Sequence, residues 1–207
     1  MVTRPPFRVG LTGNIASGKS AVAAAWQRLG APVVDADVLA RQAVAPGTLG
    51  LRAVRAAFGP DVVDAEGALD RAALRRLVFA DAAARRRLEG IVHPEVARLR
   101  AEAEARLARA GARIVVHAIP LLYEVGAEGT LDLVVLVDAP EAVRLERLLR
   151  DRALPEAEAR AMIAAQQPAQ AKRARADLVI DNDGTLAQLA AEAERAWAEI
   201  RERAGAA

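Results

Sequence analysis

Residues 13–20 read GNIASGKS, which matches the phosphate-binding loop pattern GxxxxGK[ST]. A short, partly apolar run at 7–12 precedes this loop, and residues 19–29 at its end favour a helix. A strand, a loop with glycines and a helix N-terminus form a site in which successive backbone N–H groups hold phosphate oxygens. The stretch therefore predicts an α/β protein that binds a nucleotide. The alternative is a chance match in a chain rich in alanine and glycine, and the strand–helix context argues against it.

The residues of this pattern have separate expected roles. Gly13 and Gly18 allow backbone angles and close approaches that a Cβ atom would block. Lys19 is expected to reach the β- and γ-phosphates, and the Ser20 hydroxyl is expected to ligate Mg²⁺. Lys19 and Lys172 are the only lysines among 29 basic residues, which favours a compact ammonium at position 19. The residues expected to contact the nucleotide are Gly13, Asn14, Ile15, Ala16, Ser17, Gly18, Lys19, Ser20 and Ala21.

The composition limits the class of protein. A chain of 207 residues fits one domain, or one domain with inserts. The absence of cysteine excludes disulfides and thiol chemistry, and two histidines without cysteine make a zinc site not credible. The sequence has neither an uncharged apolar run of about 18 residues nor an apolar signal-peptide core, so we expect a cytoplasmic enzyme without a membrane span.

The charge pattern does not indicate a nucleic-acid partner. The net charge is only +2, aromatic residues make up 3% of the chain, and arginines alternate with acidic residues along the helices. The run 85–87 is three arginines, which we interpret as a solvated helix face, with phosphate binding as the alternative. We expect a small-molecule substrate, no nucleic-acid or membrane partner, and a monomer or small homo-oligomer.

Short apolar runs alternate with helical segments along the chain. Buried parallel strands are expected at 7–12, 32–35, 113–117, 133–138 and 177–181. Helices are expected at 19–29, 38–45, 48–58, 141–150 and 185–203, with two or three pieces over 70–110 and two over 155–175. His93-Pro94 is expected to end one helix and begin another, with His93 in a structural role. This order predicts one three-layer α/β/α domain over 1–207 with a central parallel sheet.

The strand spacing is uneven. The stretch between the second and third strands is far longer than a crossover connection needs. We therefore expect residues 40–110 to form a helical, substrate-binding insert. Residues 151–176, before the last strand, form a second excursion that is rich in arginine, alanine and glutamine. Paired helices there predict a lid.

Two aspartates follow the second strand. Ligands of open parallel sheets bind beyond the carboxyl ends of the strands, so Asp37 is expected to face the phosphate site. A hydroxyl acceptor needs a carboxylate that orients it and takes its proton, and we assign this role to Asp37. The alternative is that Asp37 only caps a helix at 38–45. Asp35 ends the strand and is expected to bond to backbone or to hold Mg²⁺ through water.

Arginines recur along the helix expected at 141–150. Arg144, Arg147 and Arg150 are spaced three apart, so they drift along one face. A kinase needs cations that neutralise the transferring phosphoryl group, and Arg147 and Arg150 are the candidates. The alternative is a set of surface ion pairs with Glu141 and Glu146. The run PLLYE at 120–124 follows the third strand, so its Tyr and Glu are candidates for substrate contact.

Taken in order, these motifs resemble those of the dephospho-coenzyme A kinase family over nearly the whole chain. The counterparts are GLTGNIASGKS at 10–20, VDAD at 34–37 with Ala40-Arg41, His93-Pro94, PLLYE at 120–124, Arg147 and Arg150-Asp151, Ala165-Gln166, and VIDNDG at 179–184. The loop alone is weakly specific, whereas the ordered set is strongly specific. Asn14 and Ala16 stand where the family usually has glycine, and Ala21 stands where threonine is usual.

The resemblance implies a P-loop nucleoside triphosphate hydrolase type of fold and transfer of the ATP γ-phosphoryl group to the ribose 3′-hydroxyl of dephospho-coenzyme A. It implies ATP and Mg²⁺ as cofactors, Asp37 as the base, and Lys19, Arg147 and Arg150 as catalytic cations. Two alternatives stay open: a small-molecule kinase with another acceptor, and a nucleotide-dependent switch that binds a protein. The chain has no Asn-Lys-x-Asp guanine motif, which argues against a GTPase switch.

Overall fold

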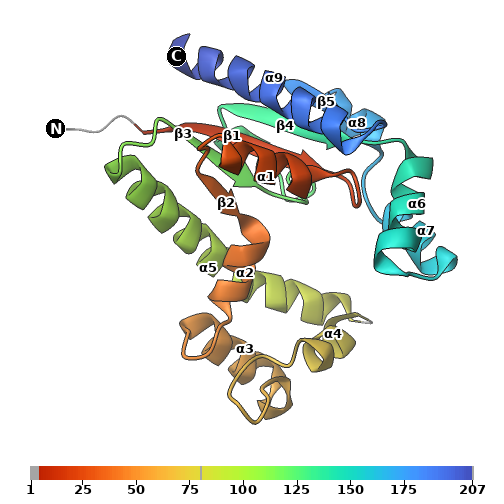
Figure 1. Ribbon diagram of the computed structural model, residues 1–207. Helices are drawn as coiled ribbons and strands as arrows, with labels where there is room; N and C mark the ends of the chain where they lie inside the picture. The colour runs from red at the N-terminus through yellow and green to blue at the C-terminus, as the bar shows by residue number, and fades with distance from the viewer. Residues whose placement is uncertain (1–4, 80, 207) are drawn as a thin grey trace. The chain divides into compact units, whose positions relative to one another are not determined.

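The computed structural model describes residues 5–79 and 81–206, and its centre is a five-stranded sheet (Figure 1). The strands are β1 (Phe7–Gly13), β2 (Val33–Asp35), β3 (Ile114–Ala118), β4 (Leu133–Asp138) and β5 (Leu178–Asp181), in the spatial order β2-β3-β1-β4-β5. β1 pairs in parallel with β3 and β4, and β4 pairs in parallel with β5. β3 and β2 thus lie on one side of β1, and β4 and β5 lie on the other. This reversal of strand order leaves a crevice at the carboxyl end of β1.

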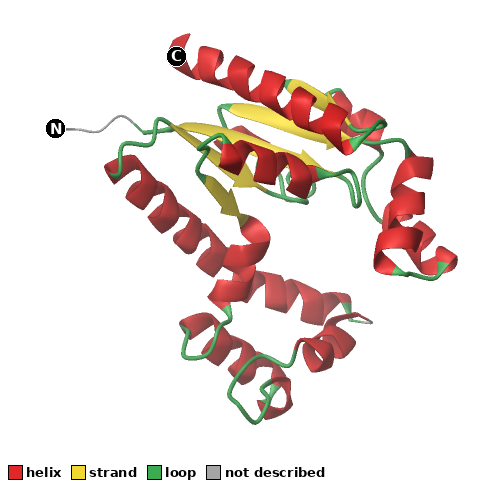
Figure 2. Ribbon diagram, in the orientation of Figure 1, coloured by secondary structure: helices red, strands yellow, loops and turns green. Residues whose placement is uncertain are grey.

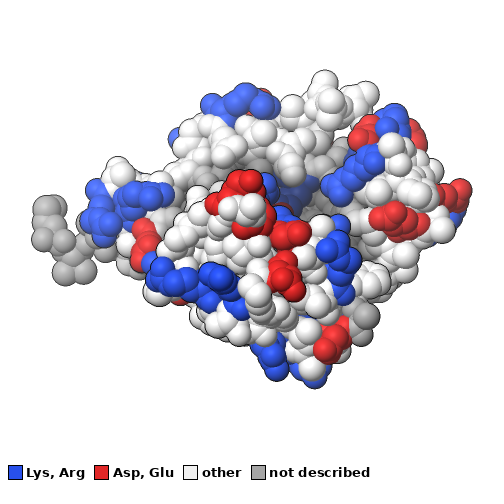
Figure 3. Space-filling model, turned by 90° about the horizontal axis from the view of Figure 1, so that it is seen from below, with Lys and Arg blue, Asp and Glu red and all other residues white. Residues whose placement is uncertain are grey.

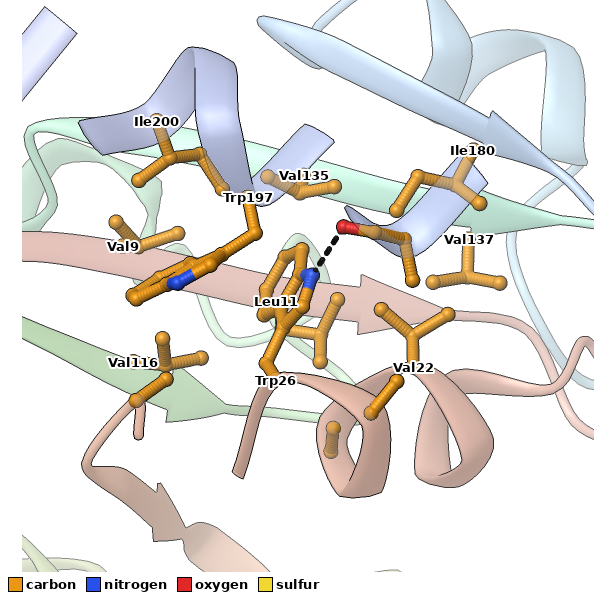
Figure 4. Packing of buried hydrophobic residues seen from close by; sticks show 14 of the residues in the cluster. Val9, Leu11, Val22, Trp26, Val116, Val135, Val137, Ile180, Trp197 and Ile200 are labelled. Atoms are coloured by element: carbon orange, nitrogen blue, oxygen red, sulfur yellow. Dashed lines mark hydrogen bonds between the residues drawn. The ribbon is translucent and has the colours of Figure 1, made fainter. Parts of the chain in front are cut away.

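The chain forms two compact units, and the first contains this sheet. Its helices are α1 (Lys19–Arg28), α6 (Glu141–Arg152), α7 (Glu156–Ala164), α8 (Ala169–Arg173) and α9 (Leu186–Ala206), with a short 3₁₀ turn η2 (Glu128–Thr130). α1 and α9 lie side by side on one face of the sheet (Figure 1). The core between them and the sheet contains Trp26 and Trp197, whose rings lie 5.7 Å apart. The indole N–H of Trp26 donates to the carbonyl of Ala193 over 2.7 Å (Figure 4). This bond satisfies the one polar atom that the buried indole brings into the core.

A second compact unit covers Asp35–Arg106 and is helical (Figure 2). It contains α2 (Ala36–Ala43), α3 (Leu49–Phe58), η1 (Pro60–Val62), α4 (Arg71–Phe79) and most of α5 (Ala82–Arg109). Val44, Val54, Val62 and Leu74 form its buried centre. Thr48 caps α3, because its hydroxyl accepts from the N–H of Leu51 over 3.1 Å.

The expected strands and most expected helices are present within a few residues, and the three-layer α/β/α class is confirmed. The expected helix break at His93-Pro94 is wrong, because α5 runs through Pro94 without interruption. Proline removes one N–H donor from a helix and its ring crowds the carbonyl of residue i−4, but Leu88, Ile91 and Val92 pack on the apolar centre of the unit just before it. Tertiary packing therefore holds the helix through this position.

The surface fits the charge pattern of the sequence. The three arginines at 85–87 are exposed, as expected, and Arg85 lies 4.0 Å from Glu89. On the face seen in Figure 3, basic and acidic side chains are interspersed with uncharged ones. No helix in the described part of the chain combines the length and the apolar character that a bilayer crossing needs.

Candidate active site

The phosphate-binding loop spans the five residues between β1 and α1. Ala16 and Gly18 have φ angles of 58° and 97°, so the loop turns twice through the left-handed region. Gly18 occupies the N-cap of α1, and no side chain caps this helix. Because a helix supplies no acceptors for its first N–H groups, the amides of Lys19 and Ser20 stand ready for an anion.

Several carbonyl groups of the loop accept hydrogen bonds from donors of the protein. The Asn14 carbonyl accepts from the Ser17 N–H at 3.0 Å, and the Ser17 carbonyl accepts from Asn182 Nδ2 at 2.7 Å. The Ala16 carbonyl accepts from the Arg147 guanidinium at 3.2 Å. These bonds fix the peptide planes of the loop, which favours a nest of inward amides for phosphate oxygens.

The two glycines of the motif are required by close contacts. A Cβ atom on Gly13 would collide with Ser17 Oγ and with the carbonyl oxygen of Val137 in β4. At Gly18, the Cβ would collide with the side-chain amide of Asn182, and the positive φ adds strain for any L side chain. At both positions, therefore, neighbouring atoms occupy the space that a side chain would need.

Lys19, Ser20 and Ala21 begin α1 on the partly solvated side of the loop. Lys19 is partly exposed, whereas Ser20 and Ala21 are exposed. A hydroxyl oxygen is the kind of ligand that Mg²⁺ accepts. Within residues 5–79 and 81–206 no group of three or more His, Cys, Asp or Glu side chains could hold a metal ion. The exposed Ser20 hydroxyl at the start of α1 is of the chemical type that fits a magnesium ion.

The two aspartates after β2 have different local roles. Asp35 caps α2, because its carboxylate accepts from the N–H groups of Asp37 and Val38 at 2.8 and 3.3 Å. Asp37 lies in the first turn of the helix and is exposed. The alternative in which Asp37 caps the helix is thus wrong: Asp35 is the cap, and the Asp37 carboxylate is not used for it.

The three arginines of α6 differ in environment. Arg144 is 4% exposed and donates to the Ala139 carbonyl at 3.1 Å. Arg147 reaches the phosphate loop and also donates to the main-chain and side-chain oxygens of Asn182 at 3.1 and 3.2 Å. Arg150 is exposed and pairs with Asp151 at 2.7 Å and with Glu146 at 3.0 Å. Its hydrogen bond lowers the pKa of Asp151. The structure thus brings Arg147 to the loop, and it holds Arg150 in the surface pairs of the alternative interpretation.

Asn182 is a partner of the loop that the sequence analysis named only within the VIDNDG motif at 179–184. It is 4% exposed and, besides its bonds to Ser17 and Arg147, its N–H donates to the Asp138 carbonyl at 2.7 Å. Its position one residue after β5 was the available signal, because strand ends of a parallel sheet share one edge. Its partners lie more than 30 residues away along the chain, so no local pattern could indicate them.

Comparisons with known proteins agree with this geometry. The model of the dephospho-CoA kinase family matches residues 7–188. A dephospho-CoA kinase of Anaeromyxobacter dehalogenans is 52% identical over 93% of this chain and 92% of its own length. The crystal structure of TT1252 from Thermus thermophilus superimposes with a TM-score of 0.82 at 41% identity, covering 95% of this chain and 98% of that one. The dephospho-CoA kinase from Campylobacter jejuni gives 0.71 at 26% identity, with 93% and 96% covered. The chain therefore belongs to the dephospho-CoA kinase family.

Proposed function

We propose that this chain transfers the γ-phosphoryl group of ATP to the ribose 3′-hydroxyl of dephospho-CoA, which gives CoA and ADP. The observation that carries the proposal is the phosphate loop, with its carbonyls bonded to protein donors in front of an uncapped helix N-terminus. Membership of the dephospho-CoA kinase family supplies the acceptor. This reaction makes the chain a kinase whose acceptor is an alcohol.

The loop and its basic neighbours bind the triphosphate in this proposal. Residues Gly13 to Ala21 surround the phosphate oxygens, with the N–H groups of Lys19 and Ser20 as donors, and the Lys19 ammonium contacts the β- and γ-phosphates. The Ser20 hydroxyl would hold Mg²⁺, which would supply positive charge to the triphosphate. Arg147 adds positive charge from a position fixed against the loop. We further propose that Arg150 leaves its exposed pairs with Glu146 and Asp151 to neutralise the transferring group.

Asp37 is the proposed base. It accepts the proton of the 3′-hydroxyl as the ribose oxygen bonds to the γ-phosphorus and the bond to the β,γ-bridging oxygen of ATP breaks. Its position two residues after β2, in the exposed first turn of α2, supports this role. Asp35, which caps the same helix, positions it.

The remaining parts complete the proposal. The helical insert at 40–110 binds dephospho-CoA, and the lid at 151–176 closes over the phosphates and excludes water, which limits hydrolysis of ATP. We place the reaction in the cytoplasm and assign it to a monomer or a small homo-oligomer.

An assay of ADP release with ATP and Mg²⁺ tests the function. Turnover should require dephospho-CoA, should fail with AMP or shikimate, and should yield CoA by mass spectrometry. Asp37→Asn should lower kcat by about 10²- to 10⁴-fold with ADP affinity unchanged. Glu194→Gln, at an exposed position of α9 outside the insert and the lid, is the matched control and should keep full activity. ADP release without any acceptor, or full activity of Asp37→Asn, would contradict the proposal and favour a nucleotide-dependent switch.

A further inference from the structure

The phosphate loop has a second set of partners on the segment between α7 and β5. We call residues 166–172 the lid root. Gln166 Oε1 accepts from the backbone N–H of Ile15 at 2.7 Å. One residue earlier in the loop, Asn14 Nδ2 donates to the Gln167 carbonyl at 3.3 Å. The lid root therefore holds the loop at two adjacent residues, on amides other than those at the start of α1.

The lid root is fixed in turn by an ion pair. Lys172 is fully buried, and its ammonium lies 2.7 Å from Glu124 Oε1. The same oxygen is 3.5 Å from the backbone N–H of Gln167. Glu124 belongs to the segment after β3, and its side chain is 21% exposed. The Glu124 carboxylate thus joins Gln167 and Lys172 of the lid root to the segment that follows β3.

The ion pair favours the charged form of Glu124. Burial raises the pKa of Glu124, but the hydrogen bond and positive charge of Lys172, together with backbone N–H groups of Glu124 and Gln167, hold the pKa below its ordinary value. A second link lies just beyond the lid root, where the Arg175 guanidinium stacks 4.6 Å above the Tyr123 ring and pairs with Glu128. The lid root is therefore held to residues 123–128 by several contacts, whereas its contact with the loop rests on Gln166 and Gln167.

Lysine suits this place better than the arginine that the chain uses elsewhere. Only two of the 29 basic residues are lysines, and the other one is Lys19 of the phosphate motif. A slender alkyl chain with a compact ammonium can enter a fully buried slot, while a planar guanidinium needs more room and more acceptors.

We propose that Lys172 and Glu124 anchor the lid root so that Gln166 holds the phosphate loop in its binding shape, which makes these three positioning residues for the nucleotide. A loop that is already ordered gives up less conformational entropy when phosphate binds. The effect should thus appear in nucleotide affinity rather than in affinity for the acceptor. This inference rests on the proposed binding of a nucleoside triphosphate at the loop.

Substitution of Gln166 gives the first test. Gln166→Met removes the acceptor of the Ile15 N–H and keeps the length of the side chain. Gln27→Met makes the same change at an exposed position near the end of α1, outside the loop and the lid, and is the matched control. The Kd for ADP, measured by calorimetry, and the KM for ATP should rise about fivefold in Gln166→Met, the usual effect of one lost hydrogen bond. The KM for dephospho-CoA and the melting temperature should stay at the values of Gln27→Met.

A second test separates anchoring from stability. Replacement of both charges in Glu124→Leu/Lys172→Met removes the anchor without leaving a buried unpaired charge, so the melting temperature should remain close to that of the wild type. The Kd for ADP should nevertheless rise severalfold. A merely structural pair would give wild-type ADP affinity in this stable double variant.

Two results overturn the proposal. One is an equal Kd for ADP in Gln166→Met and Gln27→Met, and the other is wild-type ADP affinity in a stable double variant. Because ADP binding is measured without any acceptor, a wild type that binds ADP but does not phosphorylate dephospho-CoA would refute the proposed function alone. A wild type that binds no ADP would refute both.

Discussion

Lys172→Met provides a quantitative test of the buried ion pair. The substitution leaves an apolar side chain of similar length in the slot and leaves Glu124 without its cation. Breaking a buried pair by removing one partner costs about 3–5 kcal/mol, mostly because the remaining charge stays buried without compensation. Glu124 keeps 21% of its side chain exposed, so we expect a loss near the lower bound, about 3 kcal/mol. In a chain of this size, each kcal/mol lowers the melting temperature by about 2–4 °C.

The loss should depend on pH in a defined direction. In the wild type, the lowered pKa of Glu124 gives stability that is present above the pKa of the unfolded chain and is lost as the pH falls through the folded value. Without Lys172, only the backbone N–H groups of Glu124 and Gln167 oppose burial, so the pKa of this carboxyl should lie above its wild-type value. Glu124 of the variant is then neutralised at milder acidity. The stability gap between the two proteins should therefore be largest at neutral pH and should shrink below about pH 5.

The assay is thermal and urea unfolding, followed by circular dichroism, at several pH values. Arg160→Met is the matched control, because it removes the cation of an ion pair with Glu156 on α7 in which both side chains are 59% exposed. Such a pair contributes about 0.3–0.5 kcal/mol. A loss for Lys172→Met that is no larger than for Arg160→Met, or that grows as the pH falls, would refute the reasoning.

Two further predictions concern the loop and the single tyrosine. Gly13→Ala should abolish ADP binding by calorimetry, because its Cβ would meet the Val137 carbonyl in β4; a folded variant with wild-type ADP affinity would contradict the assigned contact. Burial raises the pKa of Tyr123, with Arg175 opposing and Asp177 adding to the shift. Since Tyr123 is the only tyrosine, the phenolate absorbance of the folded chain should appear above about pH 10 and move to lower pH on unfolding. Stability should accordingly fall as the pH rises from the unfolded pKa toward the folded one, and titration at the ordinary pKa in the folded chain would exclude the burial effect.

Much of the fold could be predicted because its signals are local. The apolar run at 133–138 is buried on both faces of a parallel sheet, so nearly every residue in it is apolar. The pattern at 13–20 likewise depends on steric limits at two glycines. Pro94 shows where local reasoning fails. Its helix-breaking tendency is outweighed by neighbouring side chains that pack on α3 and α4, and this packing is a property of the tertiary structure.

The site was predictable only in part, for the same reason. Lys19 and Ser20 lie within the motif, and Asp37 follows a strand end, so spacing along the chain indicates them. The environments of the arginines on α6 depend on what approaches that helix. The arginines of α6 are evenly spaced in the sequence, but they have different partners. Among the hydrogen bonds of the described residues, Arg147 donates to the phosphate loop, whereas Arg150 donates only to its neighbours Glu146 and Asp151.

The phosphate loop therefore combines a local sequence with a distant support. Its eight residues define which atoms can contact phosphate, but Arg147, Gln166 and Asn182 hold its shape, and each lies more than 130 residues further along the chain. A hydrogen bond to a loop peptide group contributes about 1 kcal/mol, or about a fivefold change in affinity. Substitutions in the last third of the chain can thus change nucleotide affinity while the GxxxxGK[ST] pattern stays intact. An intact motif shows where phosphate can bind, whereas the strength of binding depends on residues that the motif does not contain.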